Sequence, residues 1–561
     1  MTLPSPALVA ERDARAIPRW ALLLLCAAYV LPGLFGRDPW RNADLVAYGF
    51  MASIAQGLAP WHAPAIGGIV AEGGLLPYWL GAVFIKALPW LDPAVAARIP
   101  FGLALAGVLV LVWYGCFHLA RTEAAQPVRF AFGGQADTVD YARAIADGAI
   151  LALLASLGLL QLGHETTPEM LQLLGMAMFV YGLAAAPYRA VKARVAVLLA
   201  LPVLACSGAP ALALLLGLGS GVLHQQSQYA RARNLLPWLV ASVLASALCA
   251  WALGGWAWRV QMNAQSLPDW LSLLAWFAWP AWLLALWTVW RWRSHWQRRH
   301  ISVPLLAALV PLIAALFMDA NDRALMLALP ALAVLAAFAL PTLQRSVSAA
   351  IDWFSVFFFS CMALFVWLYY LALHTGWPPK LLANVLRLVP GYEPRFQALA
   401  LAAAILGTLA WMWLVRWRTA RHRHALWKSL VLPASGVTLC WLLAMSLGLH
   451  LLNHVRSNES LVAQLRPLVP AQACVAMPQQ PLPLMAAVQF RGHWPVDGRT
   501  PLDFTRCDHA VVSAADAATP TPSGWMRVGM LKRPRDRAGA GYWVLQRRVP
   551  ALPALASNGA R

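Results

Sequence analysis

The sequence is poor in charged residues and lacks the signatures of several enzyme classes. Only 12% of its 561 residues are charged, whereas 60% are hydrophobic and the mean hydropathy is +0.60. Because a water-soluble domain carries about 25% charged residues, this composition excludes a soluble protein. The chain has no Walker loop, no glycine-rich dinucleotide motif and no paired-histidine zinc-protease motif. ATP-driven transport by this chain alone is therefore not expected.

The cysteines and the basic residues exclude two further classes. No pair of cysteines has the C-x-x-C spacing, which argues against a zinc site, and six of the eight cysteines stand singly in apolar segments. Cys474 and Cys507 lie in a polar C-terminal region, and we expect a disulfide between them if that region is extracytoplasmic. The net charge of +20 comes from short basic clusters between apolar runs. Such clusters set membrane topology and contact lipid headgroups, so no nucleic-acid partner is expected.

Long apolar runs predict an all-α polytopic membrane protein with about thirteen transmembrane helices. The candidate segments are 20–36, 95–119, 145–162, 169–186, 193–206, 208–224, 236–256, 276–290, 301–318, 325–343, 352–373, 396–415 and 430–452. Basic residues gather in alternate connections, which places the N-terminus in the cytoplasm and the C-terminus outside. The apolar stretch 78–90 breaks this alternation and is short of the roughly 20 residues that cross hydrocarbon. We therefore expect it at the outer interface, within a first external loop that covers residues 37–94.

The predicted transmembrane domain covers residues 1–454 and is followed by a small external α/β domain at 455–561. Segments 473–477, 510–513 and 542–547 are typical of short strands between turns. A disordered tail is the alternative, but the apolar runs in these segments argue against it.

Polar residues, mainly acids and single arginines, are expected in the external connections. They are Arg37, Asp38, Asp44, Glu72, His164, Glu165, Glu169, Arg259, Asp269, Asp319, Asp322, Arg323, Lys380, Tyr392, Glu393 and Arg395. Such groups on one membrane surface suit a site for a charged, lipid-linked substrate. The alternative is that these loops are simply polar.

The order of motifs along the chain resembles a known family. An acidic residue, Asp44, follows the first helix, and the segment 71–80 reads A-E-G-G-L-L-P-Y-W-L before A-R-I-P at 97–100. T-P-E-M-L at 167–171, S-G-A-P at 207–210 and N-D-R at 321–323 follow in the same order. This set resembles the bacterial GT-C glycosyltransferases of the ArnT-like and protein O-mannosyltransferase-like group.

The resemblance implies a GT-C fold and an inverting transfer of a sugar in the bacterial inner membrane. The donor would be a polyprenyl-phosphate-linked sugar, and the acceptor would be lipid A-like, a glycan or a protein at the periplasmic face. An inverting transfer needs a carboxylate to take the acceptor proton and cations to hold the departing phosphate. Asp44 is the candidate base, with helix N-cap of 45–57 as its alternative role. Glu72 is the second candidate catalytic residue, an acidic group that positions the acceptor or a cation, with an ordinary interfacial carboxylate as the alternative.

The remaining candidates are expected to bind substrate. They are Arg37, Tyr78, Glu169, Arg259, Asp322 and Arg323. Arg323 and Arg259 suit phosphate contacts through charge-assisted hydrogen bonds. Arg323 is the better candidate because it begins a span on the external side, and topology anchoring is its competing role. Glu169 opens a helix after a proline, where the helix dipole favours a carboxylate whatever its function.

Three positions depart from the family pattern. Leu45 replaces the second acid of an acidic pair, and Gly73 and Ser207 stand where the family has lysines. A divalent cation needs several oxygen ligands, so no metal ligand set is assigned without this second acid. A divalent cation stays open as a cofactor. Two alternatives remain, a flippase of a lipid-linked sugar and a non-catalytic relative. A flippase is expected to show inverted repeats, which are not visible here.

Overall fold

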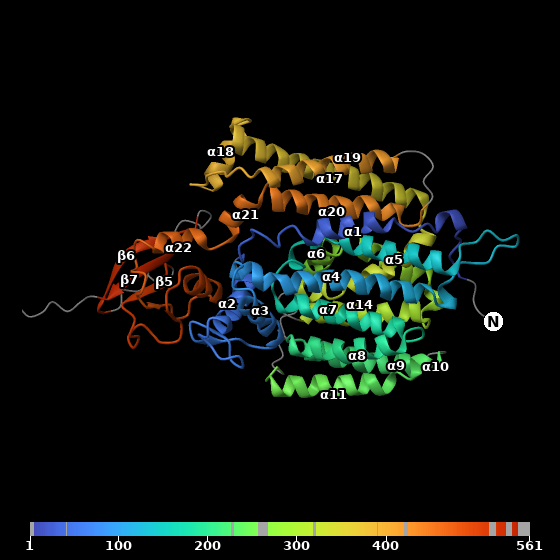
Figure 1. Cartoon of the computed structure of the whole chain (residues 1–561), viewed down its shortest axis with the longest axis horizontal. Helices are drawn as coiled ribbons and strands as arrows, with labels where there is room; N and C mark the ends of the chain where they lie inside the picture. Colours follow the sequence, from blue (N-terminus) through green and yellow to red (C-terminus); the bar gives the residue numbers. More distant parts are fainter. Residues whose placement is uncertain are drawn as a thin grey trace, which may run out of the picture. The chain divides into compact units, whose positions relative to one another are not determined.

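The computed structural model describes residues 5–40, 42–225, 229–255, 267–317, 321–389, 391–419, 425–514, 523–533 and 541–547. The chain forms two compact units (Figure 1). Unit 1 comprises Met1–Arg37, Glu72–Leu382 and Pro394–His450, and unit 2 comprises Asp38–Ala71, Ala383–Glu393 and Leu451–Arg561. The segment 37–94, predicted as one external loop, is thus divided, because Asp38–Ala71 groups with the C-terminal residues while its remainder groups with the helices.

Unit 1 is built from helices. They are α1 (Arg19–Val30), α3 (Leu76–Ala87), α4 (Pro93–Ala120), α5 (Thr138–Ala155), α6 (Leu157–Leu162), α7 (Pro168–Ala185), α8 (Ala190–Cys206), α9 (Pro210–Gln225), α10 (Ala230–Arg233), α11 (Leu236–Ala252), α12 (Leu267–Phe277), α13 (Ala281–Arg291), α14 (Arg299–Phe317), α15 (Asn321–Met326), α16 (Leu329–Ala339), α17 (Arg345–Thr375), α19 (Ala398–Thr419) and α20 (Lys428–Ser446). Helices α18 (Pro379–Leu388) and α21 (Leu449–Arg456) cross the boundary between the units.

The membrane class is confirmed, but the count of thirteen spans is not. Among the described residues, six helices are long and apolar enough to cross a membrane, or up to seven if one bent pair forms a single span. The bent pair is α12 and α13, which meet at 100° where a single span at 276–290 was expected. Several other expected spans, including α1 and α11, are apolar helices of only 10–17 residues. Hydropathy finds such segments but cannot show where a helix stops or turns.

Helix α3 (Leu76–Ala87) covers most of the apolar stretch 78–90. It has 12 residues, a length of about 18 Å, which is short of the roughly 30 Å of a hydrocarbon core. Helix α4 follows with 28 residues. Its first turn is fixed by Asp92, whose side chain accepts the backbone N–H groups of Ala94 and Val95. A Pro after an Asp N-cap is a typical helix start.

Helices α4, α7 and α8 lie side by side in unit 1 (Figure 1). Glycines let their backbones approach: a methyl group at Gly175 would lie 3.0 Å from the carbonyl oxygen of Ala200, and one at Gly115 would lie 3.5 Å from the Cα of Tyr181. Small residues at helix crossings allow the close packing on which membrane helices depend. Because Gly107 faces Leu174 while Gly115 faces Tyr181, α4 and α7 run in the same direction.

Unit 2 combines short helices with a mixed sheet. Its elements are α2 (Ala43–Ala55), β1 (Ala65–Ile66), β2 (Ile69–Val70), α22 (Glu459–Leu465), β3 (Val475–Ala476), α23 (Leu482–Ala486), a π-helical turn (Ala487–Arg491), β4 (Val496–Asp497), β5 (His509–Ser513), β6 (Trp525–Leu531) and β7 (Tyr542–Arg547). Five strands form one sheet in the order β4-β3-β5-β7-β6, and β1 and β2 form a separate hairpin. The predicted α/β fold of the C-terminal residues is confirmed. Strands β3 and β7 fall in predicted strand segments, and β5 covers the segment 510–513 but begins one residue earlier.

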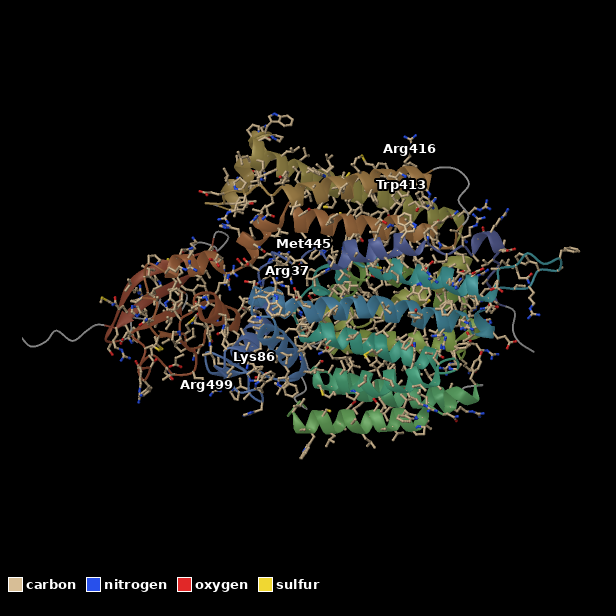
Figure 2. All side chains as sticks on the ribbon, in the orientation of Figure 1. Arg37, Lys86, Trp413, Arg416, Met445 and Arg499 are labelled. Carbon is tan, nitrogen blue, oxygen red and sulfur yellow. A yellow bond between two sulfur atoms is a disulfide. The ribbon has the colours of Figure 1, made fainter. Side chains whose placement is uncertain are left out.

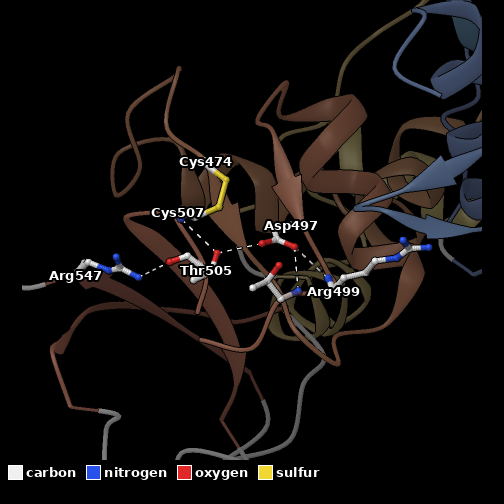
Figure 3. Close-up of a disulfide and its surroundings, with 7 residues drawn as sticks. Cys474, Asp497, Arg499, Thr505, Cys507 and Arg547 are labelled. Carbon is white, nitrogen blue, oxygen red and sulfur yellow. Dashed lines mark hydrogen bonds between the residues drawn. A yellow bond between two sulfur atoms is a disulfide. The ribbon is translucent and has the colours of Figure 1, made fainter. Parts of the chain in front are cut away.

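A disulfide joins Cys474 to Cys507 beside this sheet, a pairing that the sequence made conditional on an extracytoplasmic location (Figure 3). It closes a loop with a sequence separation of 33. Cys507 belongs to a buried cluster with Trp525 and Leu545. Asp497 stabilises the neighbouring turn, since its carboxylate accepts the backbone N–H groups of Arg499 and Thr500.

Candidate functional site

An arginine held between two carboxylates marks one end of unit 1. Glu165 lies in the connection before α7, and Glu169 lies in the first turn of that helix. Arg323 of α15 reaches both, with a guanidinium nitrogen 2.6 Å from Glu165 Oε2 and another 3.4 Å from Glu169 Oε2. It also donates to Thr167 Oγ1 at 3.0 Å. Residues 158 positions apart in sequence therefore form one acidic clamp.

The clamp is mostly closed to solvent and carries excess negative charge. The side chains of Arg323 and Glu165 are only 14% and 5% exposed. Burial lowers the pKa of Arg323, but Glu169 and Glu165 outweigh burial, so that the pKa of the guanidinium is raised and it stays charged. Because the acid Asp322 accepts the backbone N–H of Arg323, a third carboxylate stands close by. A phosphate would thus have to compete with carboxylates for Arg323.

Arg37 is anchored on the same connection. Its side chain is buried, and its Nη2 donates to the carbonyl oxygen of His164 at 2.5 Å. The His164 ring lies between Tyr29 and Trp441. Burial first, and Arg37 next to it, lower the pKa of His164 to about 4 against the opposing effect of two nearby carbonyls. The ring is therefore neutral at pH 7, and Arg37, Glu169, Asp322 and Arg323 of the predicted binding set gather at one end of unit 1.

Two of the motifs meet through their backbones in unit 1. A methyl group at Gly74 would lie 2.2 Å from both the carbonyl oxygen of Cys206 and the amide nitrogen of Gly208. The Gln172 side chain of α7 donates to the carbonyl oxygen of Ser207 at 2.7 Å and fixes this turn from the other side. The sequence order therefore identified segments that touch in three dimensions.

The backbone at Gly73 and the burial of Ser207 explain why neither position carries the lysine of the family pattern. Gly73 has φ +94°, a conformation that side-chain-bearing residues rarely adopt. Ser207 is only 1% exposed. A lysine is therefore disfavoured at both positions in this backbone. Glu72, which precedes Gly73, is exposed on the surface of unit 1.

The other predicted binding residues are less informative. Tyr78 of α3 is buried. Arg259 lies outside the described residues. Glu165 was not singled out from the sequence as a site residue, although two carboxylates four positions apart around a Thr-Pro helix start were a usable signal.

Asp44 lies in unit 2 and is not the helix N-cap that the sequence suggested. Helix α2 begins at Ala43, one residue before Asp44, and the N-cap position belongs to Asn42. The Asp44 side chain is 2% exposed, and its Oδ2 accepts the backbone N–H of Trp40 at 3.2 Å. Asp44 is therefore a buried carboxylate in the first helical turn, held by the preceding loop.

The opposite end of unit 1 is basic. Arg121, at the end of α4, stacks over Tyr188 at 4.8 Å, and Arg418 of α19 pairs with Asp352 of α17. Figure 2 shows Arg37 and Arg416 toward opposite ends of the helices. Helix α7 starts at the clamp and runs parallel to α4, whose C-cap is Arg121, so the clamp and Arg121 lie at opposite ends of unit 1. The two ends therefore differ in the sign of their charge. Within the part of the chain that the structure describes, no group of three or more His, Cys, Asp or Glu residues could hold a metal ion.

Comparison with solved structures identifies the fold. The apo crystal structure of ArnT from Cupriavidus metallidurans is similar over 94% of this chain and 97% of that one, with a TM-score of 0.62 and 14% identity. ArnT from the same organism bound to undecaprenyl phosphate gives a TM-score of 0.59 with 14% identity, over 94% of this chain and 98% of that one. An oligosaccharyltransferase of Archaeoglobus fulgidus, tethered with an acceptor peptide, gives 0.44 with 9% identity over 86% and 64%.

Sequence comparison adds no closer relative. No protein-family model matches the chain, and no curated protein matches it. The chain thus has the fold of ArnT, a GT-C glycosyltransferase, and the expected fold class is confirmed. The apolar helices and this fold indicate a multi-pass membrane protein.

Proposed function

We propose that this protein is an inverting membrane glycosyltransferase. It moves a sugar from a polyprenyl-phosphate donor to an envelope acceptor, which is lipid A-like, a glycan or a protein, at the periplasmic face of the inner membrane. The observation that carries the proposal is the ArnT fold over 94% of the chain, because the fold accounts for the helices and the external domain together. The donor chemistry is suggested by the undecaprenyl phosphate bound to one of the ArnT structures.

The charges of unit 1 support the proposed sidedness. Its basic end carries the clusters that remain in the cytoplasm of membrane proteins. The end with Arg37, Glu169 and Arg323 then faces the periplasm. There, Arg37 and Arg323 are proposed to contact the donor phosphate. This contact strengthens as the phosphate departs and gains charge. Tyr78, Glu169, Arg259 and Asp322 complete the proposed binding set.

Asp44 is the proposed general base, and Glu72 is the proposed second acidic group, which positions the acceptor or a cation. A base must accept the proton of the acceptor hydroxyl as the oxygen attacks the anomeric carbon. Asp44 suits this role, because it is buried and held by a backbone N–H. A divalent cation is not assigned to any residue.

The test is mass spectrometry of lipid, glycan and protein fractions from the source bacterium with the gene disrupted and then restored. The restored wild-type chain should return a mass equal to one sugar on one fraction, and Asp44→Asn should not. Asp92→Asn is the matched control, because asparagine also caps a helix well, and Asp92 serves as the cap of α4. A sugar mass returned in full by Asp44→Asn contradicts the base assignment.

One observation favours a second candidate, a non-catalytic relative with the same fold. The backbone disfavours a lysine at Gly73 and at Ser207. The same experiment separates the two candidates. A non-catalytic relative leaves every sugar mass unchanged when its gene is disrupted.

A further inference from the structure

Helix α21 contacts the loop that carries Asp44. The side-chain oxygen of Asn453 accepts two hydrogen bonds from that loop, one from the backbone N–H of Asp38 at 3.2 Å and one from the indole N–H of Trp40 at 3.1 Å. On the next helical turn, the Arg456 guanidinium lies over the Trp40 ring, 4.9 Å from its centroid. All of these residues belong to unit 2.

Trp40 is the link between this helix and Asp44. Its ring is only 3% exposed, and its backbone N–H donates to Asp44 Oδ2 at 3.2 Å. The backbone carbonyl of Trp40 accepts the N–H of Leu45 at 3.0 Å, which closes the turn around Asp44. The orientation of the Asp44 carboxylate therefore depends on where Trp40 is held.

Loss of the Asn453 acceptor would leave the buried indole N–H without this bond. Removal of a hydrogen bond from a buried donor is costly, so the ring would shift toward water or another acceptor. The two donors to Asn453, the Asp38 backbone N–H and the Trp40 indole N–H, lie on either side of the Trp40 Cα along the covalent chain. Loss of both bonds therefore also releases the Trp40 backbone. A displacement of the order of 1 Å at a reacting group can reduce a rate about 100-fold.

We propose that Asn453 is a positioning residue for Asp44, acting through Trp40. The inference rests on the proposed function, in which Asp44 takes the proton from the acceptor. It means that the chain beyond the last long apolar helix helps to build the catalytic loop, instead of serving only as an appended domain. Arg456 supports the same arrangement, because its cation sits on the electron-rich face of the Trp40 ring.

The test uses two variants of the full-length protein and one control. Asn453→Leu keeps a similar volume but removes the acceptor oxygen, whereas Asn453→Asp keeps an acceptor at the same position. The control is Gln464→Leu, which removes two hydrogen bonds between Gln464 and the backbone of Lys532 elsewhere in unit 2.

The first measurement needs no substrate. Amide hydrogen exchange of a peptide covering residues 38–46 should accelerate at least tenfold in Asn453→Leu, and should stay within twofold of wild type in Asn453→Asp and Gln464→Leu. Unchanged exchange in Asn453→Leu overturns the proposal. So does equal acceleration in Gln464→Leu, because this would show general loosening of unit 2.

The second measurement uses the donor lipid extract and the acceptor fraction identified by the gene-disruption experiment. Asn453→Leu should lower kcat about 10- to 100-fold with KM for the donor within twofold of wild type, and Asn453→Asp should recover kcat to within threefold. A change confined to KM, or no recovery by aspartate, overturns the positioning role. If wild type shows no transfer while exchange responds as expected, the proposed function fails and the contact to Trp40 stands.

Discussion

The Cys474–Cys507 disulfide gives a quantitative prediction for unit 2. A disulfide stabilises a fold mainly by restricting the unfolded chain, by an amount that grows with the closed loop. For the sequence separation of 33, the loop-entropy relation gives about 3.7 kcal/mol at 25 °C. At about 1.36 kcal/mol per factor of ten, this corresponds to a roughly 500-fold rise in the unfolded population of unit 2 when the bond is lost.

Proteolysis under native conditions measures this population. When reclosing is faster than cleavage, the cleavage rate follows the fraction of open molecules. Reduction of the wild-type protein in membranes should therefore accelerate thermolysin cleavage within the loop between the two cysteines by roughly two to three orders of magnitude. The Cys474→Ala/Cys507→Ala variant should be cleaved at least as fast as the reduced protein and should not respond to reductant, which separates this disulfide from the other cysteines. Acceleration of less than about tenfold would contradict the loop-entropy argument.

Three further predictions concern other contacts. Arg323→Leu should lower the free energy of unfolding by about 3–5 kcal/mol, because two carboxylates would stay in a mostly closed site, and glutamine at both partners should restore most of the loss in detergent unfolding assays. Gly74→Ala should abolish recovery of folded protein on size-exclusion chromatography, because its methyl group would overlap backbone atoms at 2.2 Å, whereas Gly221→Ala meets nothing within 4 Å and should be harmless. The stability of unit 2 should fall as the pH drops below about 4. The reason is that burial raises the pKa of Asp497 but its hydrogen bonds outweigh burial and lower it; Asp497→Asn should flatten that part of a proteolysis profile against pH.

The fold class followed from the sequence because hydropathy and turn residues are local signals. The predicted strand at 542–547 coincides with β7 (Tyr542–Arg547), and the short candidate segments at 193–206 and 208–224 both form helices, α8 and α9. Strand β6 (Trp525–Leu531) was missed. It pairs antiparallel with β7 and contains an irregularity between Arg527 and Gly529, which disturbs the alternation on which strand prediction depends.

The sequence selected several residues that the structure brings together, but it did not show how they pair. Motif order selected Glu169 and Arg323, yet nothing in a single sequence shows that residues 154 positions apart form an ion pair. The role of Asp44 as a helix N-cap failed by two positions, because the helix is capped by Asn42 and the N-terminal boundary of a helix depends on the loop before it. Asn453 was not selected from the sequence either, since an asparagine inside the short helix α21 has no local signature of a tertiary contact.

Connectivity ties the proposed base to the proposed phosphate site. Asp44 follows Arg37 by seven residues, and seven residues span at most about 25 Å when fully extended. A hydrocarbon core is about 30 Å thick, so the chain cannot carry Asp44 to the far side of a bilayer from Arg37. Asp44 also belongs to the unit that contains the disulfide, and disulfides persist in oxidising compartments. Reversing the proposed sidedness would therefore require a disulfide in the cytoplasm and the basic clusters of unit 1 outside, which contradicts two independent regularities at once.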